Sequence, residues 1–272
     1  MPRKINSYEI SEEYYDRLLI EMRNLDSCEP DTSFTLFGKS FSTPVMSAAL
    51  CLLDTMREDG TAQMAKGFKG ADACMCFGFS KDEEYDTATA EGLSPIRFIK
   101  PYRDKSRIFR EIEYTAQHGG LAVGMDIAHG MNPQGRMDLD PNRLDMYREF
   151  GPVSSADLRS FVEASPLPFI AKDVLSVTDA LKCKDAGCKG LVVGHHHSIM
   201  NYAVSPLMIL PDIRKAVGDD MVILVDGIYY GSDAFKAIAL GANAVMAGRV
   251  LIGEEFVKEG ASYVTRKIEE IT

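Results

Sequence analysis

Short apolar runs alternate with helical segments through the second half of the chain. The runs contain valine, isoleucine and leucine with little polar alternation, which is typical of parallel strands buried on both faces. They occupy residues 168–174, 190–194, 221–226 and 244–248. Because parallel neighbours need a crossover connection, usually a helix, this alternation predicts consecutive strand–helix units.

The first half of the chain repeats the pattern less cleanly. Its expected strands are 44–50, 73–77, 96–100 and 121–126. Together the two halves give eight strands alternating with eight helices, which favours an α/β fold of the (β/α)₈ TIM-barrel type over an open doubly wound sheet. The first expected strand is not followed by Gly-x-Gly-x-x-Gly, which argues further against a dinucleotide-binding sheet.

The segment before the barrel pattern predicts a short helix and a hairpin. Residues 12–25 can form an amphipathic helix with Leu18, Leu19 and Met22 on one face. Residues 33–43 suggest two short strands around Gly38, a hairpin that could plug the bottom of a barrel. We expect a single domain over 1–272, made of an extension and hairpin (1–43), the barrel (44–252) and a closing helix (253–272).

Charge and composition exclude several classes of partner. The net charge of −10 argues against nucleic acid or an anionic membrane as the main partner. We find no apolar run long enough for a membrane span and no signal-peptide core, so we expect a cytoplasmic protein. The 6 cysteines are scattered without a Cys-x-x-Cys pair, which favours buried, reduced thiols over a metal cluster.

Polar and glycine residues follow several of the predicted strands. In a (β/α)₈ barrel the site lies at the carboxyl ends of the strands, and the loops after the last two strands commonly bind phosphate. Gly227 and Gly248 stand there and allow backbone N–H groups to approach an anion, while Arg249 offers a forked positive partner. Three consecutive histidines, 195–197, follow the sixth strand. The long irregular stretch 127–153 is a further candidate for a functional loop.

An ordered set of motifs resembles the FMN-dependent α-hydroxy-acid oxidase and dehydrogenase family. The motifs are Lys172-Asp-Val, Val192-Val-Gly-His-His, Asp226-Gly-Ile and the run from Phe235 to Arg249, supported by residues 37–46 and by Val123-Gly-Met-Asp126. The similarity covers about residues 33–252. The resemblance implies a (β/α)₈ barrel that holds FMN over the strand ends.

The resemblance also implies a role for each matching residue. His196 matches the active-site base, Asp126 the carboxylate that orients it, and Lys172 the lysine at the flavin N1/O2 edge. The implied FMN-binding residues are Ala48, Ala49, Lys172, Gly194, Asp226, Gly227, Gly248 and Arg249. The chemistry is coherent, because histidine suits removal of a hydroxyl proton and a lysine stabilises an anionic reduced flavin.

The residues expected to bind substrate depart from the family. The family's Ser-Asn-His-Gly-Gly-Arg is replaced by Gly194-His-His-His-Ser-Ile199, so isoleucine stands where an arginine would hold the substrate carboxylate. The family's Gln-x-Tyr is replaced by Lys100-Pro-Tyr102. We expect Arg136, His197 or Lys100 to bind the substrate instead.

Other functions fit parts of the same pattern. His195 and His197 would share a face of a strand, and Asp126 and His129 could add metal ligands, but the spacing matches no standard metal motif, so we expect no metal. An FMN barrel that catalyses isomerisation, or a degenerate barrel that only binds FMN or phosphate, remains an alternative. We predict an FMN-dependent oxidoreductase that acts on a small hydroxyl-bearing substrate, by default a 2-hydroxy acid. Its electron acceptor is unspecified, and the family resemblance suggests a homo-oligomer such as a tetramer.

Overall fold

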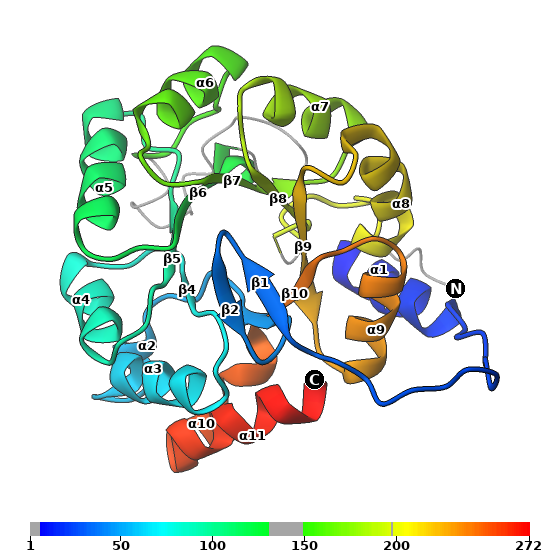
Figure 1. The fold of residues 1–272 in the computed structure, drawn as a ribbon. Coiled ribbons are helices and arrows are strands. Elements are labelled where there is room, and N and C mark those ends of the chain that lie inside the picture. Colours follow the sequence, from blue (N-terminus) through cyan, green and yellow to red (C-terminus); the bar gives the residue numbers. More distant parts are fainter. Residues whose placement is uncertain (1–5, 131–148, 197) are drawn as a thin grey trace.

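Eight parallel strands form the centre of the computed structural model, which describes residues 6–130, 149–196 and 198–272. The strands are β3 Val45–Ser47, β4 Cys76–Phe77, β5 Ile96–Ile99, β6 Ala122–Asp126, β7 Phe169–Val174, β8 Gly190–Val193, β9 Val222–Ile228 and β10 Ala244–Ala247. Their order is β3-β10-β9-β8-β7-β6-β5-β4, and a parallel bridge between Leu50 and Phe77 joins the two ends. The predicted (β/α)₈ barrel is therefore confirmed (Figure 1).

Helices alternate with these strands and form the outer layer of the barrel (Figure 1). They are α2 Leu53–Met56, α3 Gly60–Gly70, α4 Asp82–Ala90, α5 Lys105–Gln117, α6 Ser155–Ala164, α7 Val177–Asp185, α8 Pro206–Val217, α9 Gly231–Ala239, α10 Glu254–Glu259 and α11 Ala261–Ile271. Two short 3₁₀ turns, Ile127–Gly130 and Arg249–Leu251, follow β6 and β10. Several helices begin at a side-chain cap, such as Ser154 before α6 and Ser176 before α7, as expected for serine at this position.

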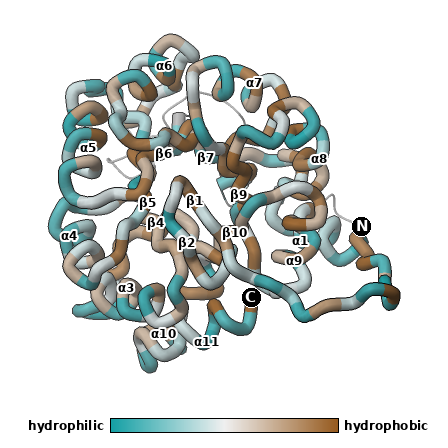
Figure 2. Tube along the Cα trace, in the orientation of Figure 1, coloured by the Kyte–Doolittle hydropathy of each residue, from teal (hydrophilic) through white to brown (hydrophobic). Residues whose placement is uncertain are grey.

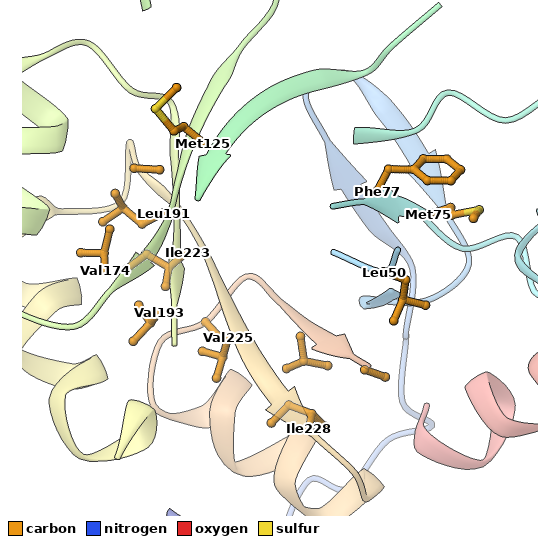
Figure 3. Packing of buried hydrophobic residues seen from close by; sticks show 14 of the residues in the cluster. Leu50, Met75, Phe77, Met125, Val174, Leu191, Val193, Ile223, Val225 and Ile228 are labelled. Atoms are coloured by element: carbon orange, nitrogen blue, oxygen red, sulfur yellow. The ribbon is translucent and has the colours of Figure 1, made fainter. Parts of the chain in front are cut away.

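The strands pack on both of their faces, which explains their apolar sequences. Along β8, Leu191 and Val193 belong to the core between strands and helices, whereas Val192 belongs to the core inside the barrel. Figure 3 shows Leu191 and Val193 of β8 in the outer core, with Ile223 and Val225 of the neighbouring strand β9. Figure 2 shows hydrophobic residues concentrated along strands such as β9, and hydrophilic residues on outer helices such as α5.

A two-stranded hairpin packs into the inner core. Its strands are β1 Phe34–Leu36 and β2 Lys39–Phe41, and Gly38 turns between them with a φ of 84°. Leu36 and Phe41 are buried with the inward side chains of the barrel strands. In Figure 1 the hairpin lies across the middle of the barrel, as the predicted plug requires.

The first helix differs from the prediction. Helix α1 spans Ser7–Arg17 instead of residues 12–25, and Leu19 and Met22 beyond it are 90% and 81% exposed. The helix begins at Asn6, whose side chain accepts from the N–H of Tyr8. The apolar residues after Arg17 suggested a longer amphipathic helix, but only Leu18 packs against the core, and the residues at 19, 20, 22 and 25 are exposed.

Among the described residues, no helix combines the length and apolarity that a membrane span requires. All 6 cysteines are described, and each is a free thiol. Four of them, Cys74, Cys76, Cys183 and Cys188, are buried as expected, whereas Cys28 is exposed and Cys51 is half-buried.

Candidate active site

A β-bulge at the carboxyl end of β7 turns two successive side chains toward the barrel mouth. Lys172 pairs with Val192 of β8, but the next pair is Val174 with Val193, so Asp173 is an extra residue in β7. Asp173 has a φ of 69°, in the left-handed region. A regular strand would place Lys172 and Asp173 on opposite faces, whereas a bulge re-aims one of them.

A second irregularity ends β9. Met246 of β10 pairs with Asp226 and Ala247 pairs with Ile228, which leaves Gly227 as the extra residue. Gly227 has a φ of 87°, a conformation that glycine adopts without steric cost. The two irregularities flank β8, and both lie at the end of the barrel where catalytic residues are expected.

His196 lies in the loop after β8 and faces two carboxylates. Its Nδ1 is 2.9 Å from Asp173 Oδ2 and 3.3 Å from Asp126 Oδ1. The Nζ of Lys172 also lies 3.1 Å from Nδ1, but it already donates to Asp173 Oδ1. Because two acceptor oxygens face Nδ1, we assign the ring proton to this atom, which leaves Nε2 able to accept another proton. The φ of His196 is 46°, a conformation uncommon outside glycine and asparagine and often found at functional sites.

Asp126 is the centre of a buried ion-pair cluster. Its side chain is fully buried, and its Oδ2 accepts from Lys100 Nζ at 2.5 Å. The Nζ of Lys172 lies 2.7 Å from Asp173 Oδ1, 3.6 Å from Asp226 Oδ2 and 3.8 Å from Asp126 Oδ1. Buried charges persist only when paired, and here each lysine faces at least one carboxylate.

The cluster shifts the proton affinities of its members. Although burial alone would raise it, the charges of His196, Lys100 and Lys172 hold the pKa of Asp126 well below its usual range. Burial alone would lower the pKa of His196, but the carboxylates, Asp126 foremost, raise it to about 9. Burial also raises the pKa of Asp173, with a further contribution from the Asp126 carboxylate. Asp126 is therefore the stronger acid of the two carboxyl groups.

His129 lies behind His196 and resembles it only in residue type. The two rings meet edge to face with centroids 4.1 Å apart, and His129 Nε2 accepts from Lys100 Nζ at 3.3 Å. Burial lowers the pKa of His129 to about 4. At neutral pH this imidazole is therefore uncharged next to a His196 ring that binds a proton readily.

Three groups of the cluster have the types of atoms that ligate metals. Ligand atoms of Asp126, His129 and His196 all lie within 4.8 Å of one another. This is not the set considered from the sequence, because His195 points away toward α1. A divalent cation bound to Asp126 would meet the ammonium groups of Lys100 and Lys172, so the arrangement favours ion pairs over a metal site.

Helix α1 forms hydrogen bonds with the loop that carries His196. The N–H of Ser198 donates to His195 Nδ1 at 2.9 Å, so His195 Nε2 carries the proton that points at Ser11 Oγ, 2.9 Å away. Ser11 Oγ in turn donates to the carbonyl of Ser7, and the N–H of Ser7 donates to Ser198 Oγ. Beta strand β8 ends at Val193, so the histidines do not continue it and alternation along a strand does not apply to them.

A cavity of about 690 Å³ opens above these groups. The predicted residues on its wall are Ala48, Ala49, Lys172, His196, Asp226, Gly227, Gly248 and Arg249. Helix α1 contributes Tyr8, Ser11, Glu12, Tyr15 and Asp16. The volume lies within the range of ligand pockets, about 300–1,000 Å³.

The remaining predicted site residues lie beside or outside this cavity. Asp126, Lys100 and Gly194 are buried beneath it, and the ammonium group of Lys100 is directed at Asp126. A Cβ on Gly194 would lie 3.1 Å from Asp226 Cβ, so glycine gives the neighbouring carboxylates room. Arg136 and His197, both predicted to bind substrate, lie outside the described residues.

The residues that line the cavity suit a ligand that has two parts. One part is a ring whose edge interacts with charged side chains, and the other is an anionic group. Lys172 and His196 meet the first requirement, and the glycines at 227 and 248 meet the second. A Cβ on Gly248 would lie only 3.0 Å from the Cβ of Ala48, so a side chain at position 248 would crowd the cavity wall. The fold and the site together define a (β/α)₈-barrel enzyme with proton-transfer groups beside a cofactor cavity.

Comparison with known proteins gives the family. The family model for FMN-dependent dehydrogenases matches residues 4–129 and 128–270, and the chain belongs to this family. The predicted cofactor, FMN, and the predicted enzyme class, a flavin-dependent oxidoreductase, are thereby confirmed.

Relatives and solved structures agree with this assignment. A peroxisomal (S)-2-hydroxyacid oxidase of Arabidopsis thaliana is 26% identical over 289 residues, covering 93% of this chain and 78% of the relative. An L-lactate oxidase of Lactobacillus jensenii is 27% identical over 256 residues, covering 84% and 62%. A structure of a mandelate oxidase mutant with (S)-mandelic acid superposes with a TM-score of 0.85 at 24% identity, covering 98% of this chain and 82% of that chain, which supports the fold.

Two groups at the site were not predicted from the sequence. Asp173 follows Lys172 in a strand, where alternation would direct it away from the barrel interior. The wall formed by α1 was missed because the expected helix was placed too far along the chain. The left-handed backbone at Asp173 leaves no mark in the sequence, although aspartate tolerates it better than most residues.

Proposed function

We propose that this chain oxidises a 2-hydroxy acid to the corresponding 2-oxo acid, with FMN as cofactor and His196 as base. The observation that carries the proposal is the placement of His196, whose Nδ1 faces Asp126 and Asp173 while its ring lines the cavity. This arrangement leaves Nε2 as the proton acceptor. Family membership and the relatives named as 2-hydroxyacid and lactate oxidases support the reaction class.

FMN binding is assigned to residues of the cavity wall. The phosphate would bind at Gly227, Gly248 and Arg249, and the flavin ring would lie toward Lys172. We assign Ala48 and Ala49 to the cavity face beneath the ring, and Gly194 and Asp226 to the strand ends that support it. When bound, FMN supplies the acceptor for the two electrons of the substrate C–H bond.

The protein's own groups handle the proton. Nε2 of His196 accepts the hydroxyl proton of the substrate, and the imidazolium that forms is stabilised by Asp126 and Asp173. Lys100 holds Asp126 from the opposite side, which fixes the carboxylate in place. Lys172 provides positive charge at the cavity wall, where negative charge would develop on reduction.

The substrate carboxylate needs a partner other than residue 199, which is isoleucine. We retain Arg136 and His197 as the leading candidates, because both belong to segments next to the site in sequence. Lys100 is the third, although its ammonium group already pairs with Asp126.

The test is an anaerobic absorption experiment on the FMN-loaded protein. A panel of small 2-hydroxy acids is added, and one or more members should bleach the flavin and yield the 2-oxo acid. His196→Ala should keep the yellow colour and lose bleaching, whereas the control His118→Ala, at the partly exposed residue that caps the C-terminus of α5, should bleach normally. Normal bleaching by His196→Ala would show that the assigned base is wrong.

The same experiment separates oxidation from the alternatives. Turnover without any electron acceptor would indicate an isomerase, and a protein that binds FMN but is reduced by no substrate would indicate a degenerate barrel. The intact cluster around His196 favours oxidation, because a barrel that only binds FMN has no need for a buried base held by two carboxylates.

We also propose that the whole chain acts as one FMN-binding domain in a cytoplasmic homo-oligomer, as a tetramer. The exposed apolar residues Leu19, Met22 and Leu25, in the segment after α1, are the type of surface that subunit contacts cover. Light scattering on the purified protein tests the subunit number. Reoxidation of the reduced flavin by dioxygen or by artificial dyes identifies the class of electron acceptor.

A further inference from the structure

Asp173 combines three properties that its position in a strand does not require. It occupies the left-handed region with a φ of 69°, its side chain is only 1% exposed, and its carboxyl group lies against the ammonium group of Lys172. A non-glycine residue in this backbone conformation is strained, and such residues cluster at functional sites. Glycine at this position would remove the strain, and asparagine would tolerate the backbone as well as aspartate does. The backbone alone therefore does not explain why residue 173 has a carboxyl group.

The bulge gives this carboxylate two partners. Asp173 Oδ1 accepts from Lys172 Nζ at 2.7 Å, and Oδ2 lies 2.9 Å from His196 Nδ1. Each oxygen therefore engages a different functional group. Gly194 borders this carboxylate, since a Cβ there would lie 3.6 Å from Asp173 Oδ1, at ordinary van der Waals distance.

We propose that Asp173 is a positioning residue, whose carboxylate bridges Lys172 and His196, aligns the base and offsets the lysine charge that faces the flavin. The inference rests on the proposed function, since it takes His196 as the base and Lys172 as the flavin contact. Asp126, the carboxylate expected to orient the base, is the more distant of the two from Nδ1, at 3.3 Å. Asp126 is also shared with Lys100, whereas both oxygens of Asp173 serve the flavin-side pair.

Removing this charge has two distinct consequences. His196 loses one of two stabilising partners of its protonated form, so its basic form should persist to lower pH. Lys172 loses its nearest counter-charge, so the cavity wall becomes more positive and favours a negatively charged reduced flavin. The flavin reduction potential should therefore rise, which is a change that loss of packing alone does not predict.

The experiment compares Asp173→Asn and Asp173→Gly in the FMN-loaded protein. Asparagine keeps the shape, and glycine suits the left-handed backbone, so at least one of the two variants should fold normally. The matched control is Asp185→Asn, an exposed aspartate at the end of α7. The readouts are the anaerobic rate of flavin reduction as a function of pH, and the reduction potential of the bound flavin against reference dyes.

Both Asp173 variants should reduce about 10- to 100-fold more slowly at the wild-type pH optimum, because the base is less well aligned. The acid limb of their pH profile should move down by about one unit, and their flavin potential should be higher. The control should match wild type in all three. If an Asp173 variant keeps the wild-type profile and potential while His196→Ala abolishes reduction, the positioning role is wrong and the proposed function stands. If His196→Ala reduces normally as well, the proposed function itself fails.

Discussion

At the scale of single residues, two neighbouring histidines acquire opposite proton affinities. His196 faces two carboxylates, which raise its pKa to about 9 against the effect of burial. His129 is buried with less compensation, which lowers its pKa to about 4. Groups of one type with affinities moved apart by their surroundings are characteristic of acid–base sites. The difference favours His196 as the group that retains the substrate proton.

The pH dependence of flavin reduction follows from this shift. A base must start unprotonated, so kcat/KM should rise about tenfold per pH unit and level off near pH 9. The raised pKa also implies that the protonated ring stabilises the folded state below the unfolded value of about 6.5, an effect lost as pH rises through about 9. Stopped-flow reduction across pH 6–10 measures the first effect. A limb at pH 6.5 or below would contradict the two-carboxylate arrangement, and His118→Ala should leave the limb unchanged.

Residue identities were predictable where a motif fixes them. His196, Asp126 and Lys172 were expected together, and their side chains do meet in one cluster. Asp173 was not expected, because its orientation depends on the pairing of β7 with β8. The register depends on both strands, so the bulge at Asp173 cannot be predicted from the sequence of β7 alone.

At the scale of elements, the later strands and helices were the easiest to predict. Buried parallel strands give continuous apolar runs, and the predicted strand 190–194 differs by one residue from β8, Gly190–Val193. Helix α1 was misplaced because its position depends on contacts of Ser7 and Ser11 with the loop after β8. Those contacts also couple the helix to the residue proposed as the base.

Ser11→Ala tests this coupling. The substitution removes the acceptor for the His195 Nε2 proton and should destabilise the protein by about 0.5–1.5 kcal/mol. Because the loop carries His196, anaerobic flavin reduction should slow as well, by less than in His196→Ala. The control Ser262→Ala, at an exposed hydroxyl near the start of α11, should change neither. A Ser11→Ala protein with the wild-type melting temperature and reduction rate would mean that α1 does not support the loop.

At the scale of the whole molecule, the cavity gathers residues from distant parts of the chain. Tyr15 comes from α1, Ala48 follows β3, Gly227 lies near the end of β9, and Arg249 follows β10. Residue 272 also reaches the segment after the hairpin, where Thr43 and Thr272 share a hydroxyl hydrogen bond of 2.6 Å. A ligand that fills this cavity therefore contacts α1, the segment after β3 and the ends of β9 and β10 at the same time.

FMN should consequently stabilise the entire fold. A ligand that binds only the folded state adds about 2.7 kcal/mol at one hundred times its dissociation constant, so the melting temperature should rise with FMN concentration. Riboflavin lacks the phosphate assigned to Gly227, Gly248 and Arg249, and should stabilise the protein much less. Gly227→Ala, which strains the backbone at a φ of 87°, should weaken the response to FMN more than the response to riboflavin. Scanning calorimetry on protein stripped of flavin measures both ligands. Equal stabilisation by riboflavin and FMN would show that the phosphate does not bind at the ends of β9 and β10.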